Sequence, residues 1–115
     1  MPTTAKFYLY ITTNKYRGTL YVGITNNLPR RILEHQSGYG GKFSYTYNCK
    51  LLVYFEPHDC YKVLQRREQV IKRWRRNWKL ELIEKNNPDW RDLCEEILPK
   101  NWEEIKLRKF IRKEY

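Results

Sequence analysis

FYLYI at residues 7–11 and LYVGI at residues 20–24 are the two stretches that specify the architecture of this chain. Read with the two-residue period of a β-strand, each stretch separates into an aliphatic face and a tyrosine-bearing face. The aliphatic face comprises Phe7, Leu9, Ile11, Leu20, Val22 and Ile24. The opposite face comprises Tyr8, Tyr10, Tyr21, Gly23 and Thr25. Three phenols are not typical of a solvent face, and the glycine leaves a gap where another group can approach the sheet closely.

The residues after each strand predict a hairpin and a helix. The polar turn at 14–18 joins the two strands, with Gly18 expected to adopt a positive φ. A helix follows, capped by Asn26 or Asn27 and ended by Gly38.

The rest of the chain predicts one more strand and four more helices. The apolar run at 51–55 is typical of a buried strand, and a helix is expected to begin at Asp59. Further helices are expected at 78–85, 89–97 and 101–113. The core stripe expected on the helix after Asp59 is Val63, Leu64, Val70, Ile71 and Trp74. Trp74 and Trp78 are both interpreted as core anchors.

These patterns predict an α/β domain with a small, mostly antiparallel three-stranded sheet and helices packed around it. We expect residues 1–98 to form this domain. Residues 99–115 are expected to add a basic C-terminal helix that packs on the domain or extends it.

Length, net charge and cysteine content limit the classes of protein to which this chain can belong. A chain of 115 residues is long enough for one real core. Its net charge of +10 indicates a polyanion such as nucleic acid, with a solvated basic surface as the alternative. The cysteines are Cys49, Cys60 and Cys94; they lack CxxC spacing, so we expect reduced thiols and no zinc site. Neither an export signal nor a run of ~20 apolar residues is evident, which favours a cytoplasmic protein with no membrane partner.

Arg31 and His35 lie one helical turn apart and are expected to approach the tyrosine face. Phenol, guanidinium and imidazole groups together suggest chemistry on a phosphate. For a tyrosine pair taken alone, cross-strand packing is the simpler interpretation.

The order of these residues resembles the GIY-YIG nuclease family, most closely its small single-domain bacterial branch, related to the nuclease half of the excinuclease C subunit. The motifs that carry the resemblance are Tyr8-Leu9-Tyr10, Tyr21-Val22-Gly23, Arg31 ten positions after Tyr21, His35, and Glu68 further downstream. Ile24 stands where some members have a lysine, and the asparagine that many members carry after the glutamate has only Asn87 as a weak candidate.

The resemblance implies a GIY-YIG fold and a catalytic set of Tyr10, Tyr21, Arg31, His35 and Glu68. In this set Tyr10 is the base, Tyr21 orients water or phosphate, Arg31 clamps phosphate oxygens, and His35 supports the base or bonds a phosphate oxygen. Glu68 is the implied ligand of Mg²⁺, for which Mn²⁺ could substitute. The simpler interpretation of Glu68 is a helical ion pair with Lys72.

Basic residues are expected to contact the nucleic-acid backbone without reading sequence. They are Arg30, Lys42, Arg66, Arg67, Arg73, Arg75, Arg76 and Lys79. The predicted function is Mg²⁺-dependent endonucleolytic cleavage of DNA, with structure-selective DNA repair or processing as one context and RNA not excluded as a substrate. The alternative is a nucleic-acid-binding module of the same fold with weak or lost cleavage. No protein partner is indicated beyond the weaker idea of support for a larger repair complex.

Overall fold

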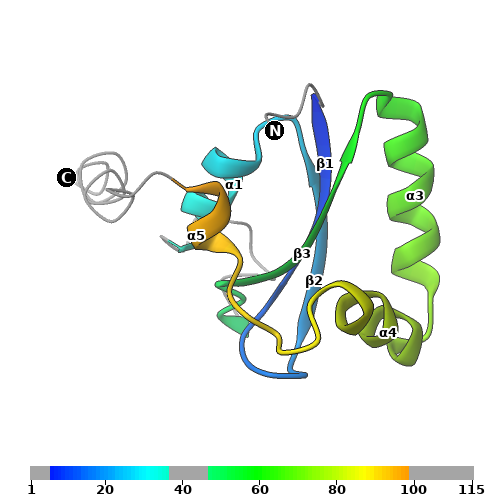
Figure 1. The fold of residues 1–115 in the computed structure, drawn as a ribbon. Helices are drawn as coiled ribbons and strands as arrows, with labels where there is room; N and C mark the ends of the chain where they lie inside the picture. Colours follow the sequence, from blue (N-terminus) through cyan, green and yellow to red (C-terminus); the bar gives the residue numbers. More distant parts are fainter. Residues whose placement is uncertain (1–5, 37–46, 99–115) are drawn as a thin grey trace.

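A computed structural model describes residues 6–36 and 47–98 of the chain. Within them, a three-stranded antiparallel sheet with strand order β2-β1-β3 lies between two layers of helices (Figure 1). Helices α1 and α5 cover one face of the sheet, and α3 and α4 cover the other. The elements are β1 (Phe7–Thr13), β2 (Leu20–Thr25), α1 (Leu28–Gln36), β3 (Leu51–His58), α3 (Tyr61–Arg73), α4 (Arg76–Asn86) and α5 (Cys94–Ile97). The predicted fold class is confirmed, while the predicted basic helix at 101–113 lies outside the described residues.

The alternation of residues along β1 produces two separate cores. Leu9 and Ile11 pack with the buried residues of α3 and α4, including Leu64 and Ile83. Tyr10 points to the other face and packs with Leu28, Ile32 and Leu33 of α1 and with Cys94 of α5. The two-faced hairpin inferred from the period of two is therefore present, and its tyrosine face is covered by α1.

Gly23 lies directly opposite Tyr10 in the pairing of β1 with β2. A Cβ atom at Gly23 would lie 2.5 Å from both Cζ and Oη of Tyr10. The gap expected above Gly23 is thus filled by the ring of Tyr10, because only a residue without a side chain lets that ring lie against the neighbouring strand.

We expect Gly23→Ala to destabilise the protein by ~1–3 kcal/mol, the usual effect of overpacking a filled site. The added methyl group would push the Tyr10 ring away from β2. Chemical denaturation of the wild type and the variant measures the difference, and equal stabilities would show that Tyr10 is not confined as described.

The hairpin turn differs from the expectation in its backbone. Arg17, and not Gly18, has the positive φ, at 51°. Gly18 is needed for space, because a Cβ atom there would collide with the side-chain oxygen of Asn14. That oxygen accepts a hydrogen bond from the backbone N–H of Thr19 at 2.9 Å, which closes the turn.

The helix boundaries and the α3 stripe also depart from the expectation. Leu64 and Ile71 are buried, whereas Val63 and Val70 are each 50% exposed. The two valines each precede a buried residue and are rotated by about 100° from it around the helix axis, which takes them off the core face. Helix α4 begins at Arg76, two residues before the predicted start.

The segment before α5 runs alongside β3 instead of forming the helix expected at 89–97. Leu93 donates its backbone N–H to Leu52 O at 2.7 Å, and Leu52 donates its own to Asp92 Oδ1 at 3.2 Å. Trp90 has a φ of 54°, which helical backbone does not allow. Pairing with β3 therefore takes the place of the first turns, and α5 is confined to Cys94–Ile97.

Candidate active site

The structure brings four of the predicted site residues together between the hairpin and α1. Tyr10 Oη and His35 Nε2 are 3.0 Å apart. Arg31 Nε donates to Tyr10 Oη at 3.1 Å. The Tyr21 ring lies 6.2 Å from the Tyr10 ring and 5.1 Å from the His35 ring, measured between centroids. Two strands and one helix thus converge on the phenol of Tyr10.

Helix α1 holds Arg31 and His35 in place through its cap and its apolar face. The Asn27 side chain accepts a hydrogen bond from the backbone N–H of Arg30 at 3.2 Å and caps the helix. Leu28 and Ile32 are buried against the same face of the sheet as Tyr10. Burial of Leu28 and Ile32 fixes the rotation of α1 about its axis. Arg31 and His35, one helical turn apart, therefore both reach the phenol of Tyr10.

Burial controls the protonation of this cluster. Desolvation first and the nearby Arg31 charge second lower the pKa of His35 to about 4, so the imidazole is neutral at pH 7. Burial raises the pKa of Tyr10 above its usual value, and Arg31 offsets only part of that effect. The Tyr10 phenol is therefore protonated and, at 0% exposure, out of contact with solvent.

The lowered pKa of His35 predicts a pH-dependent stability. An unfolded histidine has a pKa of ~6.5, so between pH 6.5 and pH 4 the unfolded chain binds more protons at this site. Stability is present above pH 6.5 and is lost as the pH falls toward 4, by up to ~3 kcal/mol. We expect urea denaturation to show this loss in the wild type relative to His35→Gln, and parallel pH profiles for the two proteins would contradict it.

Glu68 lies on α3, on the other side of the sheet, with its carboxylate 3.1 Å from Lys72 Nζ. Tyr61, Glu68 and Lys72 share one stripe of α3, being seven and four residues apart. Tyr61 lines a hollow with Arg31, and Lys72 lines another with Tyr21. Glu68 therefore lies between two hollows that reach the hairpin residues, although its contact is the helical pair with Lys72.

The described residues fit a metal site that has a single protein carboxylate. Within 6–36 and 47–98, no three His, Cys, Asp or Glu side chains gather closely enough to hold a metal. A site made of protein ligands alone is therefore not found there. A Mg²⁺ ion bound through one carboxylate, with water and substrate phosphate completing its shell, fits Glu68.

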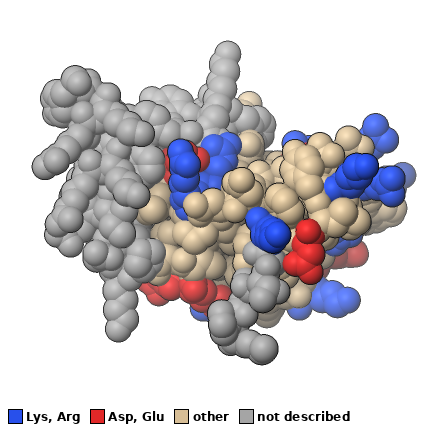
Figure 2. Space-filling model, turned by 90° about the horizontal axis from the view of Figure 1, so that it is seen from above, with Lys and Arg blue, Asp and Glu red and all other residues tan. Residues whose placement is uncertain are grey.

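The residues predicted to contact the nucleic-acid backbone differ in their exposure and in their partners. Arg66, Arg73 and Arg75 are exposed, and Arg30 is exposed with an ion pair to Glu34 at 3.7 Å. Lys79 lines the hollow beside Tyr21, and burial together with the charges of Arg76 and Lys72 lowers the Lys79 pKa. Seen from above, Lys and Arg side chains gather on the side of the molecule where α3 lies (Figure 2).

Two of the residues predicted to contact phosphate have partners within the fold, and a third lies outside the described residues. Arg67 donates to both oxygens of Glu56, at 3.0 and 3.1 Å, and lies 5.5 Å from the centre of the Trp74 ring. Arg76 donates to the carbonyls of Arg17 and Gly18 in the hairpin turn. Lys42 is the residue outside the described part of the chain.

A polar cluster on the α3 side of β3 was not predicted from the sequence. Glu56 accepts from Tyr54 Oη at 2.5 Å, lies 2.6 Å from His58 Nε2 and binds Arg67. These bonds and the partial burial of the carboxylate give it a structural role, with the Arg67, Tyr54 and His58 bonds outweighing desolvation to lower the Glu56 pKa. Tyr54, Glu56 and His58 alternate, and this period of two was the available signal for a strand that continues past residue 55.

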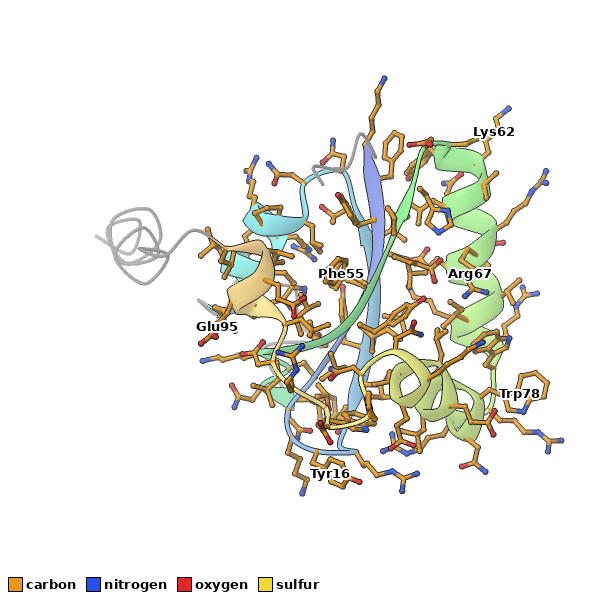
Figure 3. All side chains as sticks on the ribbon, viewed as in Figure 1. Tyr16, Phe55, Lys62, Arg67, Trp78 and Glu95 are labelled. Carbon is orange, nitrogen blue, oxygen red and sulfur yellow. The ribbon has the colours of Figure 1, made fainter. Side chains whose placement is uncertain are left out.

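Trp78 and Asn87 also differ from their expected roles. Trp78 is 53% exposed and projects from α4 away from the sheet, so its assignment to the core was wrong (Figure 3). Asn87 is buried and donates to the carbonyls of Val53 and Arg91, which ties the end of α4 to β3. Asn87 is thereby a structural residue.

Across the described residues, no helix is long and apolar enough to cross a membrane.

Comparison with known proteins agrees with this arrangement. The model of the GIY-YIG catalytic domain matches residues 6–81. A UPF0213 protein of Clostridium perfringens is 43% identical over 76 residues, covering 66% of this chain and 81% of that protein. One from Staphylococcus haemolyticus is 40% identical, covering 70% and 96%. A third, from Syntrophus aciditrophicus, is 40% identical, covering 74% and 97%. No solved structure matches the chain significantly. Fold, site and relatives lead to one conclusion: this chain belongs to the GIY-YIG nuclease family.

Proposed function

We propose that the protein is a metal-dependent endonuclease that hydrolyses phosphodiester bonds in DNA. The observation that supports this most is the hydrogen-bonded set of Tyr10, Arg31 and His35, with Tyr21 beside it, at the convergence of β1, β2 and α1. A guanidinium fixed by a buried phenol is well suited to bind a phosphate oxygen, because its planar fork needs little further ordering.

Tyr10 and Tyr21 have different roles in the proposed mechanism. Tyr10 is fully buried and holds Arg31 and His35, so it acts as a positioning residue and not as the group that meets water. Tyr21 is half-buried, hydrogen-bonds with Tyr10 and lines a hollow with Lys72 and Lys79. Tyr21 therefore orients the attacking water, and its bond to Tyr10 links Tyr21 to the neutral His35 ring through the Tyr10 phenol.

Glu68 would hold the metal, which fits a site with one carboxylate. When bound, Mg²⁺ supplies positive charge to the phosphate and to the leaving oxygen. The ammonium of Lys72 now pairs with Glu68 and would have to release it. Tyr61 and Lys72, on the same stripe of α3 as Glu68, line hollows beside the end and the beginning of β2. In this proposal the Glu68 carboxylate approaches a phosphate held by Arg31 around the β2 edge.

A nucleic-acid-binding module without cleavage is the second candidate. The Glu68–Lys72 ion pair favours it, because Lys72 already places a cation where the metal would bind. Incubation of the purified protein with linear and branched DNA and with RNA, with Mg²⁺, with Mn²⁺ or with EDTA, separates the candidates. Metal-dependent products support the nuclease, whereas binding without products under every condition supports the module. A cytoplasmic site of action is part of the same proposal.

DNA affinity is expected to depend steeply on salt and weakly on sequence. Exposed Arg66, Arg73 and Arg75 offer charge for the backbone without groups arranged to read bases. The slope of log affinity against log salt should be about −0.9 for each phosphate neutralised on duplex DNA. Titrations of two unrelated duplexes at several salt concentrations test this, and a flat salt dependence would contradict it.

A further inference from the structure

The hollow beside Arg31 has features that the proposed chemistry does not require. It has a volume of about 420 Å³ and is lined by Phe7, Ile24, Thr25, Asn26, Arg31 and Tyr61. This volume is in the range of pockets that bind small molecules. Residues from β1, β2, α1 and α3 meet there, so the hollow joins the face that carries Arg31 to the beginning of the helix that carries Glu68.

One wall of the hollow is an aromatic side chain at the surface. Tyr61 is 47% exposed, and its ring lies 5.5 Å from the ring of Phe7 at an angle of 53°. Phe7 in turn packs against the core beneath α3. Tyr61 is therefore supported from below while much of its surface stays in water, which is the arrangement of a stacking platform and not of a core residue.

The remaining walls supply charge and hydrogen-bonding groups. Arg31 contributes positive charge, which is complementary to a phosphate. Asn26 is exposed and carries an amide that both donates and accepts, as the edge of a nucleobase does. Thr25 Oγ1 accepts from the backbone N–H of Asn27 at 3.0 Å and donates to the Asn27 carbonyl at 3.2 Å, which fixes the loop that presents Asn26.

We propose that this hollow binds one unpaired nucleobase, stacked on Tyr61, next to the phosphate held by Arg31. The proposal rests on the proposed function for the placement of that phosphate. A base within a duplex is paired and stacked on its neighbours, so it cannot enter the hollow without leaving the helix. The substrate class is then nucleic acid with an unpaired nucleotide beside the scissile bond, as in single strands, flaps and frayed ends.

The test measures binding without cleavage, in EDTA. The probe is a single-stranded DNA oligonucleotide with one 2-aminopurine, an adenine analogue whose fluorescence falls when it stacks. We expect Tyr61→Leu to weaken binding of this strand by about tenfold or more, since base–aromatic stacking is worth ~1–3 kcal/mol. Tyr61→Phe, which keeps the ring, should bind and quench like the wild type, and affinity for a fully paired duplex should change less than about twofold.

Trp78→Leu is the matched control, because Trp78 is 53% exposed, close to the 47% of Tyr61, but lines a different hollow. Should Tyr61→Leu prove unstable, Asn26→Ala, on the opposite wall, should reduce affinity for the single strand without altering duplex binding. Equal losses on single strand and duplex, or no loss with either variant, would overturn the subsite. A wild type that cuts nothing while Tyr61→Leu selectively loses the single strand would refute the nuclease function and leave the subsite standing.

Discussion

Glu68→Gln is expected to lower metal-dependent cleavage by about a hundredfold or more, because a neutral amide is a far weaker ligand for Mg²⁺ than a carboxylate. The substitution keeps the size of the side chain and removes one negative charge among Arg66, Lys72 and Arg73. Affinity for DNA should therefore stay equal or rise. Single-turnover cleavage and equilibrium binding in EDTA, measured on the same substrate, separate the two effects.

Glu81→Gln is the control for Glu68→Gln. Glu81 is exposed on α4, so its substitution changes the net charge equally and should leave cleavage within about twofold. If Glu68→Gln cuts as fast as the wild type, Glu68 is not the metal ligand, whatever the activity of the protein. In that case the ion pair with Lys72 is the whole role of Glu68.

Tyr10→Phe is expected to reduce cleavage by about a hundredfold or more with little change in DNA binding. Removal of one oxygen takes away the acceptor for Arg31 Nε and the partner of His35 Nε2. The guanidinium keeps its bond to Glu34 Oε1 at 3.2 Å but loses the one made by Nε, so its position is less constrained. Misplacement of a catalytic group by about 1 Å can cost that much. The variant protein should be purified, shown to be folded, and assayed for kcat and for Kd separately.

Tyr8→Phe is the matched control for Tyr10→Phe, since Tyr8 lies on the same face of β1 and contacts the ring of Phe55. It should cut like the wild type. Comparable losses in the two variants would indicate that general packing of this face, and not the bonds of Tyr10, sets the rate. Full activity of Tyr10→Phe would remove Tyr10 from the mechanism in either role, as base or as positioning residue.

Local patterns were sufficient to predict the hairpin and most of the residue cluster. Alternation in residues 7–11 and 20–24 put Tyr10, Tyr21 and Gly23 on one face, and the four-residue spacing of Arg31 and His35 put both on one side of α1. Each of these features is set by the geometry of a single strand or a single helix. The identity of the group above Gly23 was not predictable, because it depends on the pairing register that places Tyr10 opposite Gly23.

Features that depend on contacts between distant segments were missed. The bond between Arg67 and Glu56 exists only because α3 packs beside β3, and nothing local distinguishes Arg67 from its neighbour Arg66. The segment before α5 was predicted to be helical from Asp89 onward, but pairing with Leu52, 40 residues away from Asp92, replaced the helical bonds. The exposure of Trp78 likewise depends on how α4 turns away from α3.

The family, the two-faced hairpin and the set of residue types near the phenol could be read from the amino-acid sequence, because periodicity and spacing belong to single elements. The chemical state of these groups depends instead on how the elements pack together. Cover by α1 and α5 buries Tyr10 completely, keeps its phenol protonated and makes His35 neutral. Burial depends on every element that packs against a side chain, and so the half-buried position of Tyr21 and the open hollow at Tyr61 became visible only once those elements were placed.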